Sequence, residues 1–388
     1  MTVPIMHHAG PMTFGPEGTL FVADNTIGTI FAVETGQDTT ALGGPLEVDH
    51  IDARVGETLG AAASDVTINA LAVHPASRDV YFSVSRRDEF GFRPAVVKLD
   101  RRGMPTALDL AALPCSAHEI ANVPDGTQQF RSRAGDWPVP AAGKYHAKAQ
   151  LPMRALTVVA MVHYEGELFV SGISNEEFSS TLRRVRYPFD GTSAESQIRI
   201  YHTSHGRYET RAPIRAMQIL TIDGEPTVVA AYTCSPIVLL PVADLRDGAQ
   251  VTGRTIGDMG NGQPLHMVVY QWQGQDHLFV TNAARGPQVI PVAGLQRALA
   301  YTPENAPAPR MSDLSPQMPL GPVGKTVMFV GAALHLALLD EHFFVAVVRD
   351  ARTGALHLES LPTGPLPIRL DQIWSEFDFP PPPATAPV

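Results

Sequence analysis

The chain is poor in cysteine and in charged side chains. It contains two cysteines among 388 residues, Cys115 and Cys234, and neither belongs to a CxxC or CxxCH motif. So few cysteines exclude a disulfide scaffold, and the missing motifs exclude a zinc ribbon and a covalently attached haem. Charged residues make up 18% of the chain and hydrophobic residues 44%. This balance excludes a disordered protein and predicts a large buried core.

Long apolar runs and basic stripes are also absent. No run of eighteen apolar residues occurs, so we expect no membrane-spanning helix. The formal net charge is −10 without an extended basic stripe, which argues against nucleic-acid binding. The first eight residues do not pair a basic region with an apolar one, as a signal peptide does. We expect a cytoplasmic protein if the chain is complete, and a periplasmic or secreted one if a leader was removed.

What the sequence does contain is a repeat, set among many turn-forming residues (32 glycines and 34 prolines). Six segments share a short apolar strand, a turn with glycine or aspartate, and a second apolar strand that ends in a small or polar residue. The second strands are centred on Phe21, Tyr81, Phe169, Val228, Phe279 and Phe344. Nearly continuous apolar runs of this length are typical of strands buried on both faces.

A third strand follows the second in several units, for example at 29–34, 95–100, 181–186 and 288–292. Consecutive hairpins of this kind build the four-stranded blades of a β-propeller. The sequence therefore predicts an all-β protein, a β-propeller with six four-stranded blades, with seven blades as the alternative. We expect one propeller domain over residues 1–376, a long insertion at about 101–150, and a proline-rich disordered tail at 377–388.

Residues 10–24, GPMTFGPEGTLFVAD, resemble the blade signature of the NHL and gluconolactonase/strictosidine-synthase-like propellers. The resemblance implies a propeller with an axial site at one face, and hydrolases, lyases or binding platforms as the range of activities. The gluconolactonase-like enzymes hold a calcium ion, and the first of its ligands is a glutamate directly before the Gly-Pro pair. Here that position is Ala9, so the resemblance implies the fold but does not support this calcium site.

The innermost strand of each blade lines the axis of a propeller. Aligning the six units puts one residue of each at a common level: Gly10, Asn69, Arg154, Arg215, His266 and Gly331. Two guanidiniums and an imidazole at one axis predict a site for a small anion, because arginine bonds carboxylate and phosphate in a bidentate way. In a hydrolase or lyase, His266 would be the general base, and Arg154 and Arg215 would stabilise oxyanions. The alternative is that the arginines pair with acids and merely fill the channel.

A second set of polar residues follows the second strands: Asn25, Arg87, Asn175, Cys234, Asn282 and Arg349. Together with Asn69, the arginines and amides of this set are our candidates for ligand binding. Amide oxygens also suit a cation that prefers oxygen ligands. The alternative is that these residues simply end strands and cap turns.

The 14 histidines are unevenly placed. Beside His266, the candidates for a metal site are His8, His146, His202, His205 and His335. Imidazole suits copper, iron and zinc, and each blade of a propeller can contribute one ligand. The sequence therefore leaves the cofactor open: the protein has none, or it binds a divalent metal (Ca, Cu, Fe or Zn). A histidine-rich metal-binding or redox-linked propeller is the second functional hypothesis, and a protein-interaction platform that uses the loops or the proline-rich tail is the third.

Overall fold

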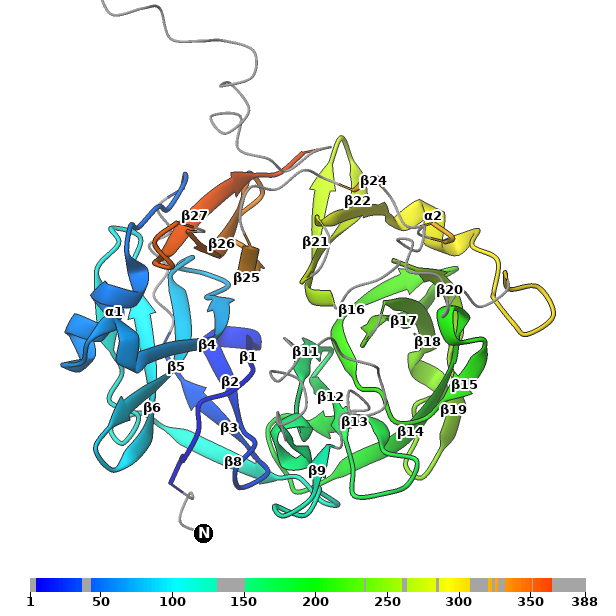
Figure 1. Cartoon of the computed structure of the whole chain (residues 1–388), viewed down its shortest axis with the longest axis horizontal. Helices are drawn as coiled ribbons and strands as arrows, with labels where there is room; N and C mark the ends of the chain where they lie inside the picture. The colour runs from blue at the N-terminus through cyan, green and yellow to red at the C-terminus, as the bar shows by residue number, and fades with distance from the viewer. Residues whose placement is uncertain are drawn as a thin grey trace, which may run out of the picture.

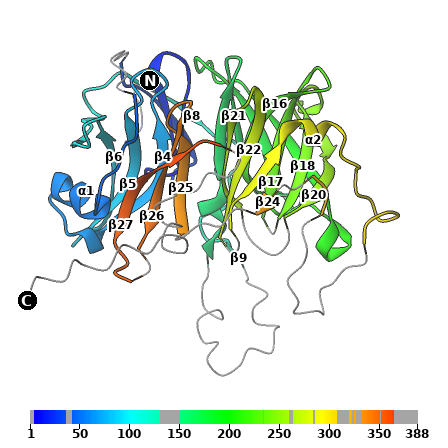
Figure 2. The same cartoon turned by 90° about the horizontal axis from the view of Figure 1, so that it is seen from above.

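The computed structural model describes residues 5–36, 43–130, 151–233, 235–259, 264–283, 286–307, 320–322, 325–326, 332–350 and 352–364. The chain is a six-bladed β-propeller (Figure 1). The strands of each blade run between the two faces of the ring (Figure 2). The prediction of six blades is thereby confirmed. Within the described residues, the structure has no helix whose length and apolarity would suit a membrane crossing.

Each blade is named here by its innermost strand. The β1 blade holds β1 (Met12–Phe14), β2 (Thr19–Asp24), β3 (Thr29–Glu34) and β8 (Cys115–Glu119). The β4 blade holds β4 (Val66–Val73), β5 (Val80–Asp88), β6 (Gly91–Leu99) and β7 (Pro105–Ala107). The β11 blade holds β11 (Ala160–Tyr164), β12 (Glu167–Ile173), β13 (Ser180–Arg186) and β14 (Ser193–His202), extended by β15 (Arg207–Glu209) and β19 (Gln250–Thr252).

The other three blades follow in chain order. The β16 blade holds β16 (Ile214–Ile222), β17 (Glu225–Tyr232), β18 (Pro236–Pro241) and β20 (Arg254–Asp258). The β21 blade holds β21 (Pro264–Trp272), β22 (Gln275–Asn282), β23 (Gln288–Pro291) and β24 (Lys325–Thr326). The β25 blade holds β25 (Ala332–Leu338), β26 (Phe343–Arg349) and β27 (Leu356–Pro362).

Short elements lie between and beside the blades. They are the helices α1 (Ile51–Leu59) and α2 (Val292–Gln296), the hairpin of β9 (Gln129–Phe130) and β10 (Leu151–Pro152), and the 3₁₀ helices η1 (Pro16–Gly18), η2 (Ala63–Asp65), η5 (Met153–Leu156), η6 (Thr203–His205) and η7 (Val242–Asp244).

The order of the blades around the ring differs from their order in the chain. The neighbouring inner strands are β4, β1, β11, β16, β21, β25 and again β4 (Figure 1). The chain therefore builds three strands of the β1 blade, steps back to complete the β4 blade, and returns with β8 as the outermost strand of the first sheet. The first part of the predicted insertion at about 101–150 holds β7 and β8. Residues 131–150 and the tail at 377–388 lie outside the described residues.

The ring closes between the β25 blade and the beginning of the β4 blade. Val48 and Leu358 exchange two backbone hydrogen bonds of 2.9 Å each, which form an isolated bridge at the edge of the three-stranded β25 blade. The hydroxyl of Ser360 bonds both the N–H and the carbonyl oxygen of Leu46. Segments far apart in the sequence are thus joined at the edge of this blade, and α1 packs beside them.

Each junction between neighbouring blades has its own hydrophobic core. In β17, Val228, Ala230 and Tyr232 face the β11 blade. The residues between them, Val229 and Ala231, face the β21 blade. Because side chains alternate along a strand, a strand between two blades must be apolar at nearly every position. This is the physical reason for the apolar runs in the sequence, and all six predicted second strands are present.

Candidate ligand site at the propeller axis

Four of the inner strands carry a β-bulge at a similar level. The pairing register shifts at Asn69 in β4, at Arg215 in β16, before Met267 in β21 and at Leu334 in β25. A bulge adds one residue to a strand and re-aims the side chains around it. The alignment of the repeats predicts Asn69, Arg215 and His266 at one level, and the structure places each of them at or beside such a bulge.

A side chain near this level joins each blade to the next one around the ring. Six side chains, one from each blade, donate to backbone carbonyls of the next blade: Asn25 to Ala155 and Val158, Ser171 to Ile214, Gln218 to Met267, His266 to Leu334, His335 to Ile68, and Asn69 to Ala9. All seven bonds run in the same circular direction. Four of the residues predicted to bind a ligand or metal, Asn25, Asn69, His266 and His335, therefore also hold the blades together.

The imidazoles of His266 and His335 lie side by side, with ring centroids 5.4 Å apart. The Nε2 atom of His266 is 2.8 Å from the carbonyl oxygen of Leu334, and that of His335 is 3.0 Å from the carbonyl oxygen of Ile68. A carbonyl oxygen only accepts, so Nε2 carries the hydrogen in both rings and Nδ1 presents a lone pair. The Nδ1 atom of His335 is buried without a hydrogen-bond partner among the described residues.

Burial keeps both imidazoles neutral. Burial is the main cause that lowers the pKa of His266 to about 3. His335 and Arg215 also lower this pKa, whereas the hydrogen bond to Leu334 raises it. Burial also lowers the pKa of His335, although the hydrogen bond of this residue to Ile68 acts in the opposite direction. A neutral imidazole offers a hydrogen-bond acceptor that an imidazolium lacks, so these two rings can receive an O–H or N–H from a ligand.

Arg215 supplies a positive charge near His266. It lies close enough to His266 to lower the pKa of that imidazole. Its own pKa is lowered by burial, and no carboxylate of the described residues acts in the other direction. Its Nε atom is buried and has no hydrogen-bond partner in the part of the chain that the structure describes. A buried guanidinium without an acid is costly unless an anion offsets its desolvation.

Arg154 is placed differently from the sequence alignment. It lies in η5, before the inner strand β11 begins, and not on an inner strand. Its Nε donates to the carbonyl oxygen of Pro124 at 2.9 Å, and its Nη1 to that of Thr26 at 3.3 Å. Its guanidinium therefore already has partners in neighbouring loops. The physical reason is a contact with another blade, because Asn25 takes the carbonyls of Ala155 and Val158 that an extended strand would need.

The remaining candidates for ligand binding bond within their own blades or end strands. Arg87 forms an exposed ion pair with Asp65, 2.8 Å between Nη2 and Oδ1. Arg349 is exposed and donates to the carbonyl oxygen of Gly354. Asn175 is exposed after β12, and Asn282 is the last residue of β22. Cys234 and Gly331 lie outside the described residues.

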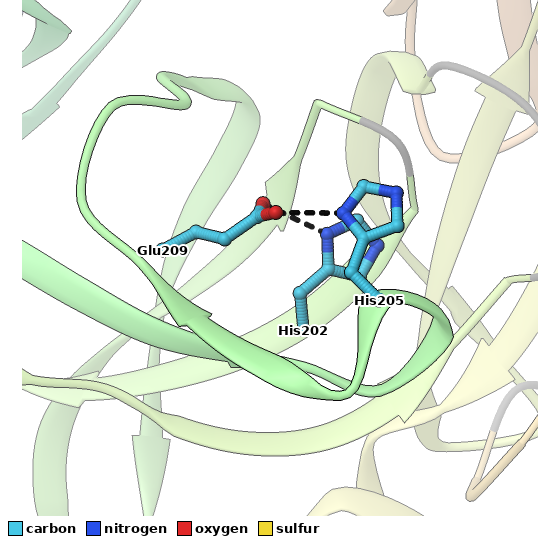
Figure 3. A group of neighbouring side chains, drawn as sticks. All are labelled: His202, His205 and Glu209. Atoms are coloured by element: carbon cyan, nitrogen blue, oxygen red, sulfur yellow. Dashed lines mark hydrogen bonds and ion pairs between the residues drawn. The ribbon is translucent and has the colours of Figure 1, made fainter. Parts of the chain in front are cut away.

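The histidines proposed as metal ligands lie in separate parts of the ring. His8 precedes β1, and its backbone N–H donates to Asp24. His335 is on the inner strand β25 with its ring against that of His266, and His146 lies outside the described residues. His202 and His205 are brought together in the β11 blade, where both contact Glu209 (Figure 3). The sequence interpretation missed Glu209, although its place four residues after His205, across a glycine turn, was a usable signal.

Comparison with known proteins finds only distant similarity, which carries no argument about this chain. No protein-family profile and no curated protein matches the chain. Among solved structures, the PQQ-bound aldose sugar dehydrogenase from Streptomyces coelicolor is 11% identical, with 92% of this chain and 95% of that chain covered and a TM-score of 0.32. A glucose dehydrogenase is 11% identical (92% and 97% covered, TM-score 0.33). The β-propeller domain of Cps50 (Swd1) from Myceliophteria thermophila is also 11% identical (93% and 99% covered, TM-score 0.35).

Such distant similarity assigns no role to any residue. The propeller that residues 10–24 led us to expect is confirmed by the blades themselves. Membership of the NHL or gluconolactonase-like group stays a prediction.

Proposed function

We propose that this propeller binds a small anionic molecule at its axis, with Arg215 as the anchor and His266 and His335 as hydrogen-bond acceptors. One observation carries the proposal: the guanidinium of Arg215, whose Nε is buried and which has no carboxylate partner among the described residues, lies near the neutral imidazole of His266, which contacts that of His335. Arginine binds carboxylate and phosphate with two parallel N–H···O bonds. An anion at this place offsets the cost of burying the charge of Arg215.

The two imidazoles narrow the class of ligand. A lone pair on Nδ1 accepts a hydrogen bond but does not attract a second negative charge. The arrangement therefore suits a molecule that carries an acid group for Arg215 and a hydroxyl or amine for an imidazole. A hydroxy acid is the simplest compound of this kind. The resemblance of residues 10–24 to propellers with an axial site agrees with this location.

In this proposal His266 binds the ligand and does not abstract a proton from it. A general base works best when its pKa lies near the working pH. Burial lowers the pKa of His266 to about 3, which makes its imidazole a weak base near neutrality. The hydrolase or lyase activity expected from the sequence is therefore not part of this proposal. An anion bound beside His266 raises the pKa of its imidazole. Measured catalytic turnover would therefore extend the binding proposal and not replace it.

Thermal unfolding with a panel of small anions tests the proposal. We expect the melting temperature to rise with a hydroxy acid such as lactate or gluconate, because a ligand that binds only the folded state stabilises it. At a hundred times Kd the gain is about 2.7 kcal/mol. The Arg215→Gln variant should lose the response. The matched control is Arg154→Gln, which removes a half-buried guanidinium that already has carbonyl partners and should keep the response.

Equal responses in the two variants would contradict the proposal. So would a wild-type protein whose melting temperature is unaffected by every hydroxy acid, simple carboxylate and phosphate tested.

A further inference from the structure

The hairpin of β14 and β15 places three side chains of metal-binding type at its closed end. His202 is the last residue of β14, His205 is the last residue of η6, and Glu209 is the last residue of β15. His202 pairs with Arg207 and Ile200 with Glu209 across the hairpin, so His202 and Glu209 are diagonal neighbours. Residues at such positions lie within reach of each other when their side chains are long.

The turn that joins the two strands brings the second histidine back to the first. Gly206 has a left-handed conformation (φ 64°, ψ 29°) and ends η6, and its N–H donates to the carbonyl of His202 at 2.8 Å. The imidazoles of His202 and His205 then lie with their centroids 3.8 Å apart (Figure 3). A residue with a β-carbon is disfavoured in this conformation, which explains glycine at this position.

The donor atoms of the three side chains converge on one point. The Nδ1 atom of His202 is 2.9 Å from one oxygen of Glu209, and the Nδ1 atom of His205 is 2.6 Å from the other. One ligand atom from each residue lies within 4.8 Å of the other two. Among the described residues, no other group of three histidine, cysteine, aspartate or glutamate side chains is this close. The side chain of His202 is fully buried, while 24% of His205 and 17% of Glu209 is exposed.

A buried carboxylate of the next blade holds the turn between the two histidines. Asp258, at the end of β20, accepts hydrogen bonds from the hydroxyls of Thr203 at 2.6 Å and Ser204 at 2.8 Å. It also accepts one from Ser235. Thr203 and Ser204 are the residues that separate His202 from His205. The pair of imidazoles is therefore positioned by the packing of two blades and not by the hairpin alone.

We propose that His202, His205 and Glu209 bind one divalent transition-metal ion. Two imidazole nitrogens and one carboxylate oxygen form a ligand set that zinc and iron(II) accept in proteins. Bonds of about 2.0–2.2 Å from such a metal place its ligand atoms roughly 3.4 Å apart, which small outward shifts of these side chains provide. The ion takes the place of the two hydrogens now shared with Glu209, and the imidazole protons move to Nε2.

Three protein ligands leave at least one coordination position open. Structural zinc sites have four protein ligands, whereas sites with three keep a position for water or substrate. The partial exposure of His205 and Glu209 gives such a ligand access from solvent. This site is on the outer part of the β11 blade and shares no residue with the site around Arg215. The two proposals are therefore independent of each other.

Titration calorimetry of the full-length protein with Zn²⁺, after dialysis against a chelator, tests the site. We expect one Zn²⁺ per chain. Co²⁺ should give the intense visible absorption of a low-coordinate ion with nitrogen ligands. His205→Ala and Glu209→Gln should each abolish stoichiometric binding. Asp258→Asn should weaken it about 10- to 100-fold, the range seen when residues that orient ligands are changed.

Two controls make the result decisive. His342→Ala removes an exposed histidine that lies 3.5 Å from a carboxylate elsewhere on the surface, and it should leave binding unchanged. Arg215→Gln should also leave binding unchanged. Melting temperatures recorded without metal separate loss of binding from loss of folding. If wild-type protein takes up no Zn²⁺, or if folded His205→Ala and Glu209→Gln bind it as wild type does, the proposal is wrong.

Discussion

The Nε2 atom of His266 donates a hydrogen bond to the carbonyl oxygen of Leu334 at 2.8 Å. This bond joins the β21 blade to the β25 blade and fixes the tautomer of the imidazole. The same ring therefore has two tasks. One nitrogen joins the two blades, and in the proposed site the other would accept a hydrogen bond from a ligand beside Arg215. The assembly of the blades and the chemistry of the axis depend on the same residues.

Stability should fall when the protein is acidified below pH 6.5. Burial lowers the pKa of His266 from its ordinary 6.5 to about 3. Between these values the unfolded chain binds a proton at this residue and the folded chain does not. Its contribution to stability is therefore complete above pH 6.5 and is lost as the pH falls towards 3, by up to about 1.4 kcal/mol per pH unit.

Urea unfolding at several pH values measures this effect. In His266→Gln the amide still donates to Leu334 but does not titrate, so the dependence of stability on pH should be shallower than in wild type. An identical dependence in both proteins would refute the assignment of this shift to His266.

Asn25 should be far more important for stability than Asn175, although both follow the second strand of a blade. Asn25 is buried and makes three hydrogen bonds to the backbone of Ala155 and Val158. Asn25→Ala leaves these groups without partners, which should cost at least about 2 kcal/mol. Asn175 is exposed, so Asn175→Ala should change stability by less than about 0.5 kcal/mol. Chemical unfolding gives both values, and similar costs would contradict the role of Asn25 as a blade junction.

Gly172 should tolerate no side chain. A β-carbon at this position would lie 1.9 Å from the carbonyl oxygen of Thr157, where η5 leads into the inner strand. Gly172→Ala should therefore cost about 3 kcal/mol or more, since neither backbone segment can move without repacking the blade. Gly43→Ala is the matched control, because a β-carbon there would have nothing within 4 Å of it. Thermal unfolding compares them, and a neutral Gly172→Ala would refute the close approach.

The second strand of every blade could be predicted because its signal is local. A strand packed between two blades is apolar on both faces, and the turns beside it carry glycine or aspartate. The order of the blades could not be predicted in this way. It depends on β8 returning to β3 and on Val48 pairing with Leu358, contacts between segments far apart in the chain. No short pattern in the sequence encodes such pairings.

The candidate site residues divide in the same way, into those that a local sequence pattern indicates and those that depend on contacts between distant segments. Asn69, Arg215 and His266 stand in a repeated local pattern, so the alignment placed them at one level, and each lies at or beside a bulge. Arg154 stands in a similar string of residues, but its segment forms η5 because Asn25 of another blade binds its carbonyls. Glu209 lies four residues after His205, but it was missed because its approach to His202 depends on the pairing of β14 with β15.

The most direct test of the axial site is to observe Arg215 while an anion is added. In protein labelled with ¹⁵N-arginine, the Nε–H resonance of Arg215 is identified by its loss in Arg215→Gln. We predict that this resonance shifts and saturates with the hydroxy acid that raises the melting temperature, while the resonance of Arg154 stays in place. An Arg215 resonance that does not respond at saturating ligand, with shifts confined to other arginines, would contradict the account.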